Sequence, residues 1–352
     1  MKFQENQATF VIAEIGANHN GDMEIAKKMI DCAKECGADA VKFQSWDASL
    51  FSKQVYEENK FLGDDYRDRN DYTLREIMDK FSVSYAQMED LKAYCKDVGI
   101  IFSSTPFSAK EFSEIEKLGA PYIKIASMDL VNPEILEAAG AVRLPILLST
   151  GFSELSEIEQ AVRIIEDGGN DQLVILHCNG LYPPDDHEVN LNNMAMLRAA
   201  FGYPVGFSDH TIGVEMSIAS IALGATVLEK HFTLDKQMFG WDHAVSADPP
   251  EMAMICSAAK KIHAGLGQSR RQISPRELER RTSYRRSIVA ACDIKAGQAI
   301  GRGDITFRRP GHGIAPMQYH TVVGKIAASD IANDTIIAQE SLITPPGEDA
   351  KK

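Results

Sequence analysis

The sequence predicts an α/β protein, a (β/α)8 barrel of the TIM type followed by a small β-rich domain. Three observations support this fold class. The chain has 352 residues, which suits a barrel of about 250 residues with one small module added. Eight short apolar runs are each followed by a helical pattern or a loop, as in a parallel sheet covered by helices. After Ser287 the pattern changes to short strands and Gly-punctuated turns.

The eight apolar runs are the predicted barrel strands. They are Phe10–Gly16, Ala40–Ser45, Ile100–Pro106, Tyr122–Ser127, Pro145–Thr150, Leu173–Cys178, Val205–His210 and Val227–Phe232. Helical periodicity marks several of the intervening segments, among them Asp22–Cys36, Tyr85–Val98, Glu154–Asp167, Val214–Leu223 and Pro250–Leu266. The competing architecture is an open doubly wound sheet, which usually has fewer strands and a Gly-rich phosphate loop after the first. Here the first strand runs into A-E-I-G-A-N-H-N-G-D, which is not G-x-G-x-x-G, so a dinucleotide-binding fold is excluded.

Domain boundaries follow from changes in composition. We expect a catalytic barrel over residues 1–267, an Arg-rich linker over 268–286, the small domain over 287–344 and a disordered tail over 345–352. The linker holds seven arginines. These could form a nucleic-acid patch, but docking onto acidic surfaces of this chain or of a partner subunit is favoured. The long connection Trp46–Ser84 is either a functional lid or subunit contact, or a surface insertion.

Composition limits the possible partners. The net charge of −13 disfavours general binding to nucleic acid or to anionic membranes. The six cysteines form no C-x-x-C pair, as expected of thiols in a reducing cytoplasm. Residues 1–9 are polar, unlike a signal peptide, and no apolar run is long enough to span a membrane. We therefore expect a cytoplasmic protein.

Every predicted strand ends in polar residues. Polar groups in barrel strands cost free energy unless they are hydrogen-bonded or hold a ligand, and the carboxyl ends of barrel strands form the active-site face. Eight such ends predict a polar active-site floor. They are Glu14; Lys42 and Gln44; Ser103, Ser104 and Thr105; Lys124 and Ser127; Ser149 and Thr150; His177; Ser208 and His210; and Glu229 and His231.

These residue types suggest a chemistry. Lys42 and Lys124, with hydroxyls from Ser104, Thr105, Ser127, Ser149, Thr150 and Ser208, are what a phosphate or phosphate ester needs. Side chains alternate along a strand, so His210 shares a face with Ser208 and His231 with Glu229. Two imidazoles meeting in one crevice suit Mn²⁺, Fe²⁺, Co²⁺ or Zn²⁺. The alternative is two unrelated histidines, one capping a helix and one packed in a core.

The carboxylates Glu14 and Glu229 are candidates for proton transfer or for holding metal-bound water. His177 and Cys178 are adjacent and must point to opposite faces, so they cannot form a catalytic dyad. No Ser-His-Asp arrangement is found. The residues therefore indicate metal-assisted chemistry on a small phosphorylated anion, and leave open whether the enzyme is a lyase, a hydrolase or a transferase.

Nine motifs in order resemble the sialic acid (N-acetylneuraminate) synthase family, the bacterial nonulosonate synthases. They are A-E-I-G-A-N-H-N-G-D at 13–22, V-K-F-Q-S at 41–45, S-T-P-F at 104–107, Y-I-K-I-A-S at 122–127, L-S-T-G at 148–151, L-H-C-x-x-L-Y-P at 176–183, S-D-H-T at 208–211, E-K-H-F-T-L-D-K at 229–236 and R-P-G-H-G at 309–313. The resemblance covers nearly the whole chain. It implies a barrel followed by an antifreeze-like (SAF) domain, in a domain-swapped homodimer.

The resemblance also implies an activity: phosphoenolpyruvate condenses with the open-chain aldehyde of an N-acyl amino sugar, and phosphate leaves by C–O cleavage. His210 and His231 would bind the metal, with Mn²⁺ expected and Mg²⁺ or Co²⁺ as alternatives, and with Glu14 and Glu229 they form the implied catalytic set. Phosphoenolpyruvate would contact Lys42, Thr105, Lys124, Ser127, Ser149, Asn179 and Ser208. The sugar would contact Gln44, Asp129, Tyr182, Asp242 and, from the partner's small domain, Arg309.

Three departures from the family pattern bear on the acceptor: Asn179–Gly180, where the family often has a hydroxyl or amide at the second of the two positions, Asp129 where Glu is common, and Trp241 where Pro is usual. The acceptor is therefore N-acetylmannosamine or a relative, or a diacetamido sugar of the legionaminic or pseudaminic type. A non-catalytic ice- or carbohydrate-binding protein and a metal phosphohydrolase are the hypotheses from other classes.

Overall fold

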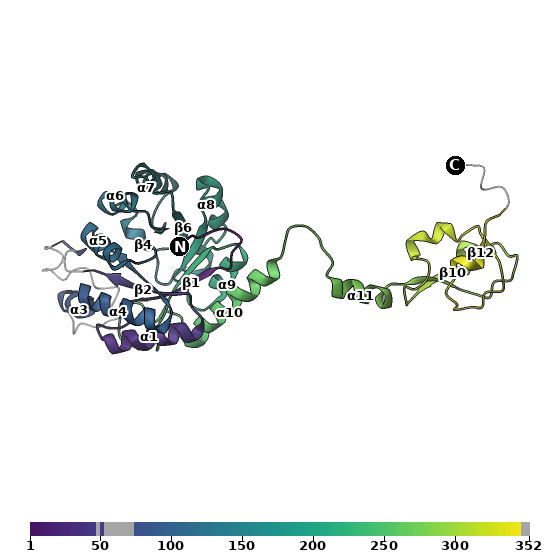
Figure 1. Ribbon diagram of the computed structural model, residues 1–352, viewed down its shortest axis with the longest axis horizontal. Coiled ribbons are helices and arrows are strands. Elements are labelled where there is room, and N and C mark those ends of the chain that lie inside the picture. Colours follow the sequence, from purple (N-terminus) through teal and green to yellow (C-terminus); the bar gives the residue numbers. More distant parts are fainter. Residues whose placement is uncertain (47–49, 53–73, 346–352) are drawn as a thin grey trace. The chain divides into compact units, whose positions relative to one another are not determined.

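The structure is a computed structural model that describes residues 1–46, 50–52 and 74–345. Its chain separates into two compact units, Met1–Gly267 and Gln268–Lys352 (Figure 1). The division coincides with the start of the predicted Arg-rich linker. None of the helices in the described ranges combines the length and hydropathy needed to cross a bilayer.

The first unit is a near-closed barrel of eight parallel strands. Its hydrogen-bonded order is β3-β2-β1-β8-β7-β6-β5-β4, and the two ends of this order are linked where Ser103 Oγ of β3 donates to the Tyr122 carbonyl before β4, at 2.7 Å. The predicted barrel is thus confirmed. The strands are β1 (Phe10–Gly16), β2 (Ala40–Ser45), β3 (Ile101–Pro106), β4 (Ile123–Ile125), β5 (Ile146–Ser149), β6 (Leu173–Cys178), β7 (Val205–Asp209) and β8 (Val227–His231).

Helices follow the strands and ring the sheet (Figure 1). The helices are α1 (Met23–Cys36), α3 (Leu74–Phe81), α4 (Tyr85–Val98), α5 (Ala109–Leu118), α6 (Pro133–Ala141), α7 (Leu155–Asp167), α8 (Asn193–Phe201), α9 (Glu215–Ala222) and α10 (Pro249–Leu266). The five predicted helical segments are helices, and their bounds agree within one residue at either end. The helices α3, α5, α6 and α8 lie in segments for which no helix bounds were predicted. Of the insertion Trp46–Ser84, residues 47–49 and 53–73 lie outside the described part of the chain.

Local signals fix where these helices begin and end. The Asp22 side chain accepts from the first-turn amides of α1, and Ser84 with Gln87 forms a capping box before α4. Gly37 and Gly99 close the same helices in the left-handed conformation, which costs glycine least. The capping side chains satisfy amide groups that a helix start leaves without partners.

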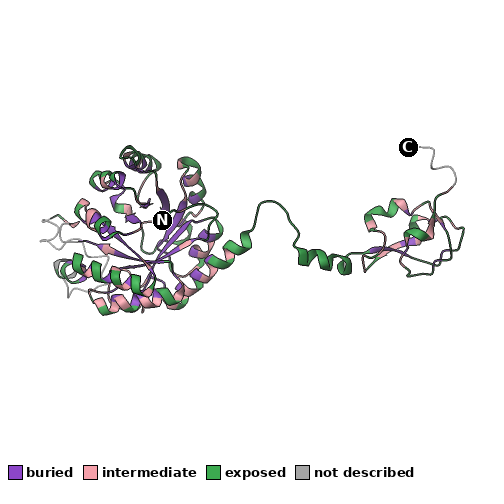
Figure 2. Cartoon of the chain, in the orientation of Figure 1, coloured by how far each residue is buried: buried purple, intermediate pink, exposed green. Residues whose placement is uncertain are grey.

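Strand alternation divides the barrel into two cores. Inward-facing residues form an apolar layer inside the barrel, and outward-facing residues pack beneath the helices. Figure 2 shows the strands buried and the surrounding helices buried only on one side. The inner layer comprises Ile12, Ala40, Tyr122, Leu147, Val174, Leu176 and Val227. This layer fills the barrel interior below the carboxyl ends of the strands.

The second unit has its own small core. Antiparallel pairs join β9 (Ser287–Ala290) to β10 (Ile305–Arg308) and β11 (Ile326–Ala327) to β12 (Leu342–Ile343). Nine buried residues, mainly isoleucines such as Ile288, Ile300 and Ile337, form its interior. The predicted β-rich domain is confirmed. The Arg-rich segment, which was predicted as a linker, contains the exposed helix α11 (Pro275–Tyr284). Residues 346–352 of the predicted tail lie outside the described chain.

Candidate functional site

A cavity of about 650 Å³ opens at the carboxyl ends of the barrel strands. The predicted site residues that line it come from strands or loops spread around the whole barrel, so residues far apart in sequence meet at one mouth. They are Glu14, Lys42, Gln44, Thr105, Lys124, Ser127, Ser149, Tyr182, Ser208, His210, Glu229, His231 and Asp242.

The position of these side chains follows from strand parity. On β1, Ile12 lies in the inner apolar core and Glu14 lines the cavity above it. On β8, Val227 lies in that core and Glu229 lines the cavity. The pairing of β1 with β2 shifts register after Glu14. Gly16 has a φ of +53° there, a backbone conformation that residues other than glycine rarely adopt. The floor is thus a polar layer built directly on an apolar one.

Two lysines and two glutamates occupy the centre of the floor. Lys42 Nζ lies 2.6 Å from Glu14 Oε2 and 3.8 Å from Glu229 Oε2, and Lys124 Nζ lies 3.3 Å from Glu229 Oε1. Gln44 Nε2 donates to Glu14 Oε1 at 3.0 Å. All four charged side chains are almost fully buried. Buried charge is costly unless it is paired, and here each charge has a partner of opposite sign.

The two carboxyl groups differ in proton affinity. Burial raises the pKa of Glu14 to about 7, and the charge of Glu229 adds to this effect, although Lys42 opposes it. Burial would also raise the pKa of Glu229, but Lys124, Lys42 and the Ser208 hydroxyl together lower it to about 2. Neighbouring carboxyl groups with separated pKa values can divide the roles of acid and base. With Glu14 protonated, the two lysines leave the floor with a net positive charge, which suits an anionic ligand.

Hydroxyl groups surround this charged centre. Lys42 Nζ donates to Thr105 Oγ1 at 2.5 Å, and Ser208 Oγ donates to Glu229 Oε1 at 3.0 Å. Ser127 Oγ accepts from the Gly151 amide at 3.0 Å. Ser149 Oγ is buried and has no hydrogen-bond partner among the described residues. An orphaned buried hydroxyl in a ligand cavity is a donor or acceptor available to a ligand.

The two histidines face each other across the mouth, with ring centroids 5.7 Å apart. His210 Nδ1 donates to the Asn179 carbonyl at 2.7 Å, and Tyr182 Oη lies 2.9 Å from Nε2. Burial lowers the pKa of His231 well below its usual value, so this imidazole is neutral. Its Nδ1 has no hydrogen-bond partner among the described residues and lies 3.8 Å from Asp242 Oδ2.

These two imidazoles fit a divalent metal ion. Their buried position, the orphaned nitrogen of His231 and the backbone carbonyl that orients His210 match what metal-ligating histidines require. Burial alone would lower the pKa of His210, but Cys178 and the Asn179 carbonyl raise it, so metal binding there would displace a proton. The described residues contain no group of three or more His, Cys, Asp or Glu arranged to hold a metal. Substrate and water would have to complete the coordination.

A buried ion pair lies behind the floor. Asp209 and Lys230 sit between the cavity residues of β7 and β8, and their charged atoms are 3.1 Å apart with both side chains fully buried. Asp209 also accepts hydrogen bonds from Thr211 and Ser217. This outward-facing pair joins the two strands that carry the histidines, and it was not among the predicted functional residues.

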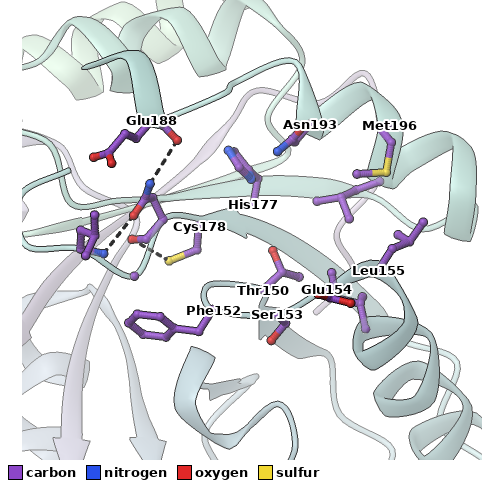
Figure 3. A pocket seen from close by; sticks show the side chains of 15 residues that line it. Thr150, Phe152, Ser153, Glu154, Leu155, His177, Cys178, Glu188, Asn193 and Met196 are labelled. Atoms are coloured by element: carbon purple, nitrogen blue, oxygen red, sulfur yellow. Dashed lines mark hydrogen bonds between the residues drawn. The ribbon is translucent and has the colours of Figure 1, made fainter. Parts of the chain in front are cut away.

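Several predicted residues lie elsewhere. The Asn179 side chain donates to the Glu188 carbonyl at 3.1 Å and accepts from the Leu181 amide at 2.9 Å, and it lines a neighbouring pocket of about 440 Å³. Figure 3 shows this pocket, with Glu188 and His177 among the labelled residues that line it. Only its backbone carbonyl reaches the site, through His210. Asp129 is buried beside Asn132, with Oδ1 accepting at 3.0 Å, and does not line the cavity. Arg309 belongs to the second unit, where its guanidinium lies 5.2 Å from the Tyr284 ring centroid.

Three polar residues of the predicted floor point away from it. His177 stacks on Phe207 and bonds the Val189 carbonyl through Nε2 at 2.6 Å. Thr150 Oγ1 donates to a backbone carbonyl, and Ser104 pairs with a serine of β2. His177 and Ser104 sit at outward positions of their strands, and Thr150 follows the last residue of β5. The expectation that all eight strands contribute every terminal polar group was therefore too broad. Cys178 lines the cavity, whereas His177 does not.

An apolar wall was missed by the sequence reasoning. On one side the cavity is lined by the side chains of Trp46, Leu50, Phe51, Met78, Phe107 and Trp241. These residues come from loops and from α3, where no strand parity indicates direction. The only signal was the occurrence of Trp241 beside Asp242, at a position where the resembling family usually has proline.

Comparison with known proteins is consistent with this geometry. The NeuB family pattern matches residues 29–271, and the SAF domain pattern matches residues 285–343. The N,N'-diacetyllegionaminic acid synthase of Campylobacter jejuni is 37% identical over 337 residues, 94% of this chain and 99% of that protein. The human N-acetylneuraminate-9-phosphate synthase is 31% identical and covers 94% of this chain and 92% of that protein.

A solved structure is also similar. The crystal structure of the N-acetylneuraminic acid (sialic acid) synthetase of Leptospira borgpetersenii superposes with a TM-score of 0.69 at 32% identity, covering 78% of this chain and 90% of that one. The family pattern spans more than half of the chain, and the relatives match almost their entire length. The chain therefore belongs to the NeuB family.

Proposed function

We propose that the protein is a nonulosonic acid synthase, which condenses phosphoenolpyruvate with the open-chain aldehyde of an N-acyl amino hexose and releases phosphate. The observation that carries this proposal is the composition of one cavity. A cationic floor with an orphaned hydroxyl, two carboxyl groups of separated pKa and a facing pair of histidines all line the same space.

Phosphoenolpyruvate binds at the floor in this proposal. Lys42 and Lys124 supply the positive charge for its phosphate and carboxylate, because ammonium groups bind such anions as point charges. Ser149 Oγ is available for a hydrogen bond, and Ser127 and Ser208 line the same end. When the anion binds, Lys42 would interact with it instead of dividing its interactions between the carboxylates of Glu14 and Glu229.

The reaction joins two carbon centres and then expels phosphate. The methylene carbon of phosphoenolpyruvate attacks the aldehyde carbon, the new C–C bond forms, and the aldehyde oxygen takes up a proton. Water adds to the resulting oxocarbenium carbon, and the C–O bond to phosphate then breaks. Glu14, which holds a proton near neutral pH, is the group we assign to proton transfer. Glu229 remains ionised and is suited to orient the attacking water.

His210 and His231 would hold the metal ion, for which we propose Mn²⁺, with Mg²⁺ or Co²⁺ able to substitute. When bound, such an ion supplies Lewis-acid polarisation of the aldehyde oxygen. The chain's own contribution is orientation, since the Asn179 carbonyl fixes the tautomer of His210. Gln44, Tyr182 and Asp242 line the remaining wall and are placed to contact the sugar.

We further propose that the protein acts as a domain-swapped homodimer in the cytoplasm, in which Arg309 of the small domain reaches the sugar in the partner's barrel. The support is the R-P-G-H-G motif and the SAF domain that carries it. Both N-acetylmannosamine and a 2,4-diacetamido-trideoxyhexose are N-acyl amino hexoses that satisfy the proposed reaction.

Phosphate release tests the proposal. The full-length protein with Mn²⁺ and phosphoenolpyruvate should release phosphate only when an N-acyl amino hexose is added, and mass spectrometry should detect the condensed acid. Release without any sugar would instead indicate a phosphohydrolase. No release with any of these sugars and any of the three metals would refute the proposed function.

A further inference from the structure

The cavity has two chemically different sides. The floor is polar and charged, whereas apolar residues from several loops line the rim, and the loops after β2, β3 and β8 supply a packed aromatic cluster there, the apolar wall. Trp46 and Trp241 form its centre, with ring centroids 5.3 Å apart at an interplanar angle of 71°. Phe107 packs edge-on against Trp46 at 6.1 Å. Such ring pairs are more stable than the area they bury would predict, so the aromatic side chains hold one another in place in this wall.

Hydrogen bonds hold the wall in place next to the histidine pair. The loop that carries Trp241 is tied to the loop after β1, since Asn20 Nδ2 donates to the Phe239 carbonyl at 2.8 Å and Asn18 Nδ2 donates to Ser246 Oγ at 2.8 Å. Trp241 is followed by Asp242, whose carboxylate lies 3.8 Å from His231. The aromatic surface therefore begins next to the histidines and extends away from the floor.

A sugar whose aldehyde lies at the histidines would meet this wall with its far end. Hydroxyl groups pressed against aromatic rings would lose water without gaining hydrogen-bond partners, which is unfavourable. Methyl groups and the methyl ends of acylamido groups would instead bury apolar surface there. The wall thus favours an acceptor whose distal hydroxyls have been replaced.

We propose that Trp241, supported by Trp46, is a specificity-determining residue that selects a 2,4-diacylamido-2,4,6-trideoxyhexose over N-acetylmannosamine. This inference rests on the proposed synthase function and assigns its acceptor class. The distal acylamido group and the C6 methyl of such a sugar pack against the indole rings. Apart from groups close to the floor, the polar groups of the described wall residues are indole N–H donors, and Trp46 Nε1 is buried without a hydrogen-bond partner among the described residues. The carbonyl oxygen of a distal acylamido group can accept from such a donor, whereas several hydroxyls of N-acetylmannosamine would be left without partners there.

The test compares two acceptors on the full-length Mn²⁺-loaded protein. For the wild type, kcat/KM with 2,4-diacetamido-2,4,6-trideoxymannose should exceed that with N-acetylmannosamine by at least about 10-fold, since one apolar group in a fitted pocket is worth roughly 10- to 200-fold. Equal or greater kcat/KM with N-acetylmannosamine would overturn the inference while leaving the synthase function intact. Failure of both sugars to yield a condensed acid would refute the function, and the inference with it.

Variants then assign the selection to the wall. Trp241→Ala should lower the ratio of the two kcat/KM values by about 10-fold or more, and Trp241→Phe should retain most of it. Phe81→Leu is the matched control, because Phe81 packs against Trp241 at 5.9 Å but does not line the cavity. Its ratio should stay within about twofold of wild type. If Trp241→Ala lowers both kcat/KM values equally, or if Phe81→Leu shifts the ratio as far, the assignment is wrong. Should Trp241→Ala not fold, Trp241→Leu replaces it and should lower the ratio in the same direction, and a Trp241→Leu ratio equal to wild type would overturn the assignment.

Discussion

The floor and the apolar wall of the cavity differ in how they are built. The floor is made of strand ends, with charged groups held by an apolar layer directly beneath them, whereas the wall is made of aromatic side chains from loops and α3. In a barrel enzyme the strands stay rigid and the loops vary. The comparison suggests a division of labour in which the floor determines the reaction and the wall determines the acceptor.

The largest effect is expected from a substitution that removes a charge from the floor. Lys124→Met keeps the apolar stem but leaves Glu229 with one cation fewer and the phosphate with one fewer partner. We expect kcat/KM to fall about 100- to 1000-fold, since preorganised charge contributes this much, and to fall equally for every acceptor. Phosphate release measures it, with Lys117→Met on the surface of α5 as control. A loss confined to one acceptor would contradict the division of labour.

A comparable loss is expected from the histidine pair. His210→Ala should weaken Mn²⁺ binding at least about 100-fold, because the described part of the chain offers two protein ligands and loss of even a supporting group costs 10- to 100-fold. Elemental analysis of dialysed protein and titration of Mn²⁺ measure this directly, independently of activity. His187→Ala, at an exposed position before α8, is the control. Unchanged metal content in His210→Ala would refute the proposed metal site.

A smaller effect is expected from the second domain. Arg309→Ala should lower kcat/KM about 10- to 100-fold, the value of one hydrogen bond to a charged group, while metal content stays at the wild-type level. The neighbouring Arg308, whose Nε lies 3.1 Å from Asp334 Oδ1 at the surface, provides the control because exposed pairs contribute little. Metal loss in Arg309→Ala would contradict the proposed role.

The last effect concerns stability rather than activity. The native pKa of Glu14 is about 7 against an ordinary value of 4.5, so between these pH values the folded protein keeps a proton that the unfolded chain has lost. The free energy of unfolding should therefore decrease as pH rises through this window, by about 3 kcal/mol at most. Glu14→Gln should flatten that decrease in urea titrations from pH 5 to 7.5. Exposed Glu137→Gln should keep the wild-type slope, and an equally steep slope in Glu14→Gln would contradict the assignment.

The sequence allowed most of the floor to be predicted, for a physical reason. Alternation along a strand determines that Ser208 and His210 share one face, and the parallel pairing of eight strands brings such faces together. The same rule, applied without counting positions, wrongly included His177 and Ser104, which alternate outward, and Thr150, which follows the last residue of β5. Asn179 lies beyond its strand, where backbone hydrogen bonds rather than parity set direction. The wall could not be predicted, because the direction of Trp46 and Trp241 depends on loop contacts between segments far apart in the chain.

The ion pair between Asp209 and Lys230 restricts which insertions and deletions the protein can tolerate during evolution. On β7 and β8, cavity residues and the residues of this pair occupy alternate positions. A point substitution alters one or the other. Loss or gain of a single codon within either strand would exchange them, moving a buried charge into the cavity and a histidine under the helices. Length changes in the gene should therefore be tolerated only in the loops, which is where acceptor preference can diverge without disturbing the chemistry.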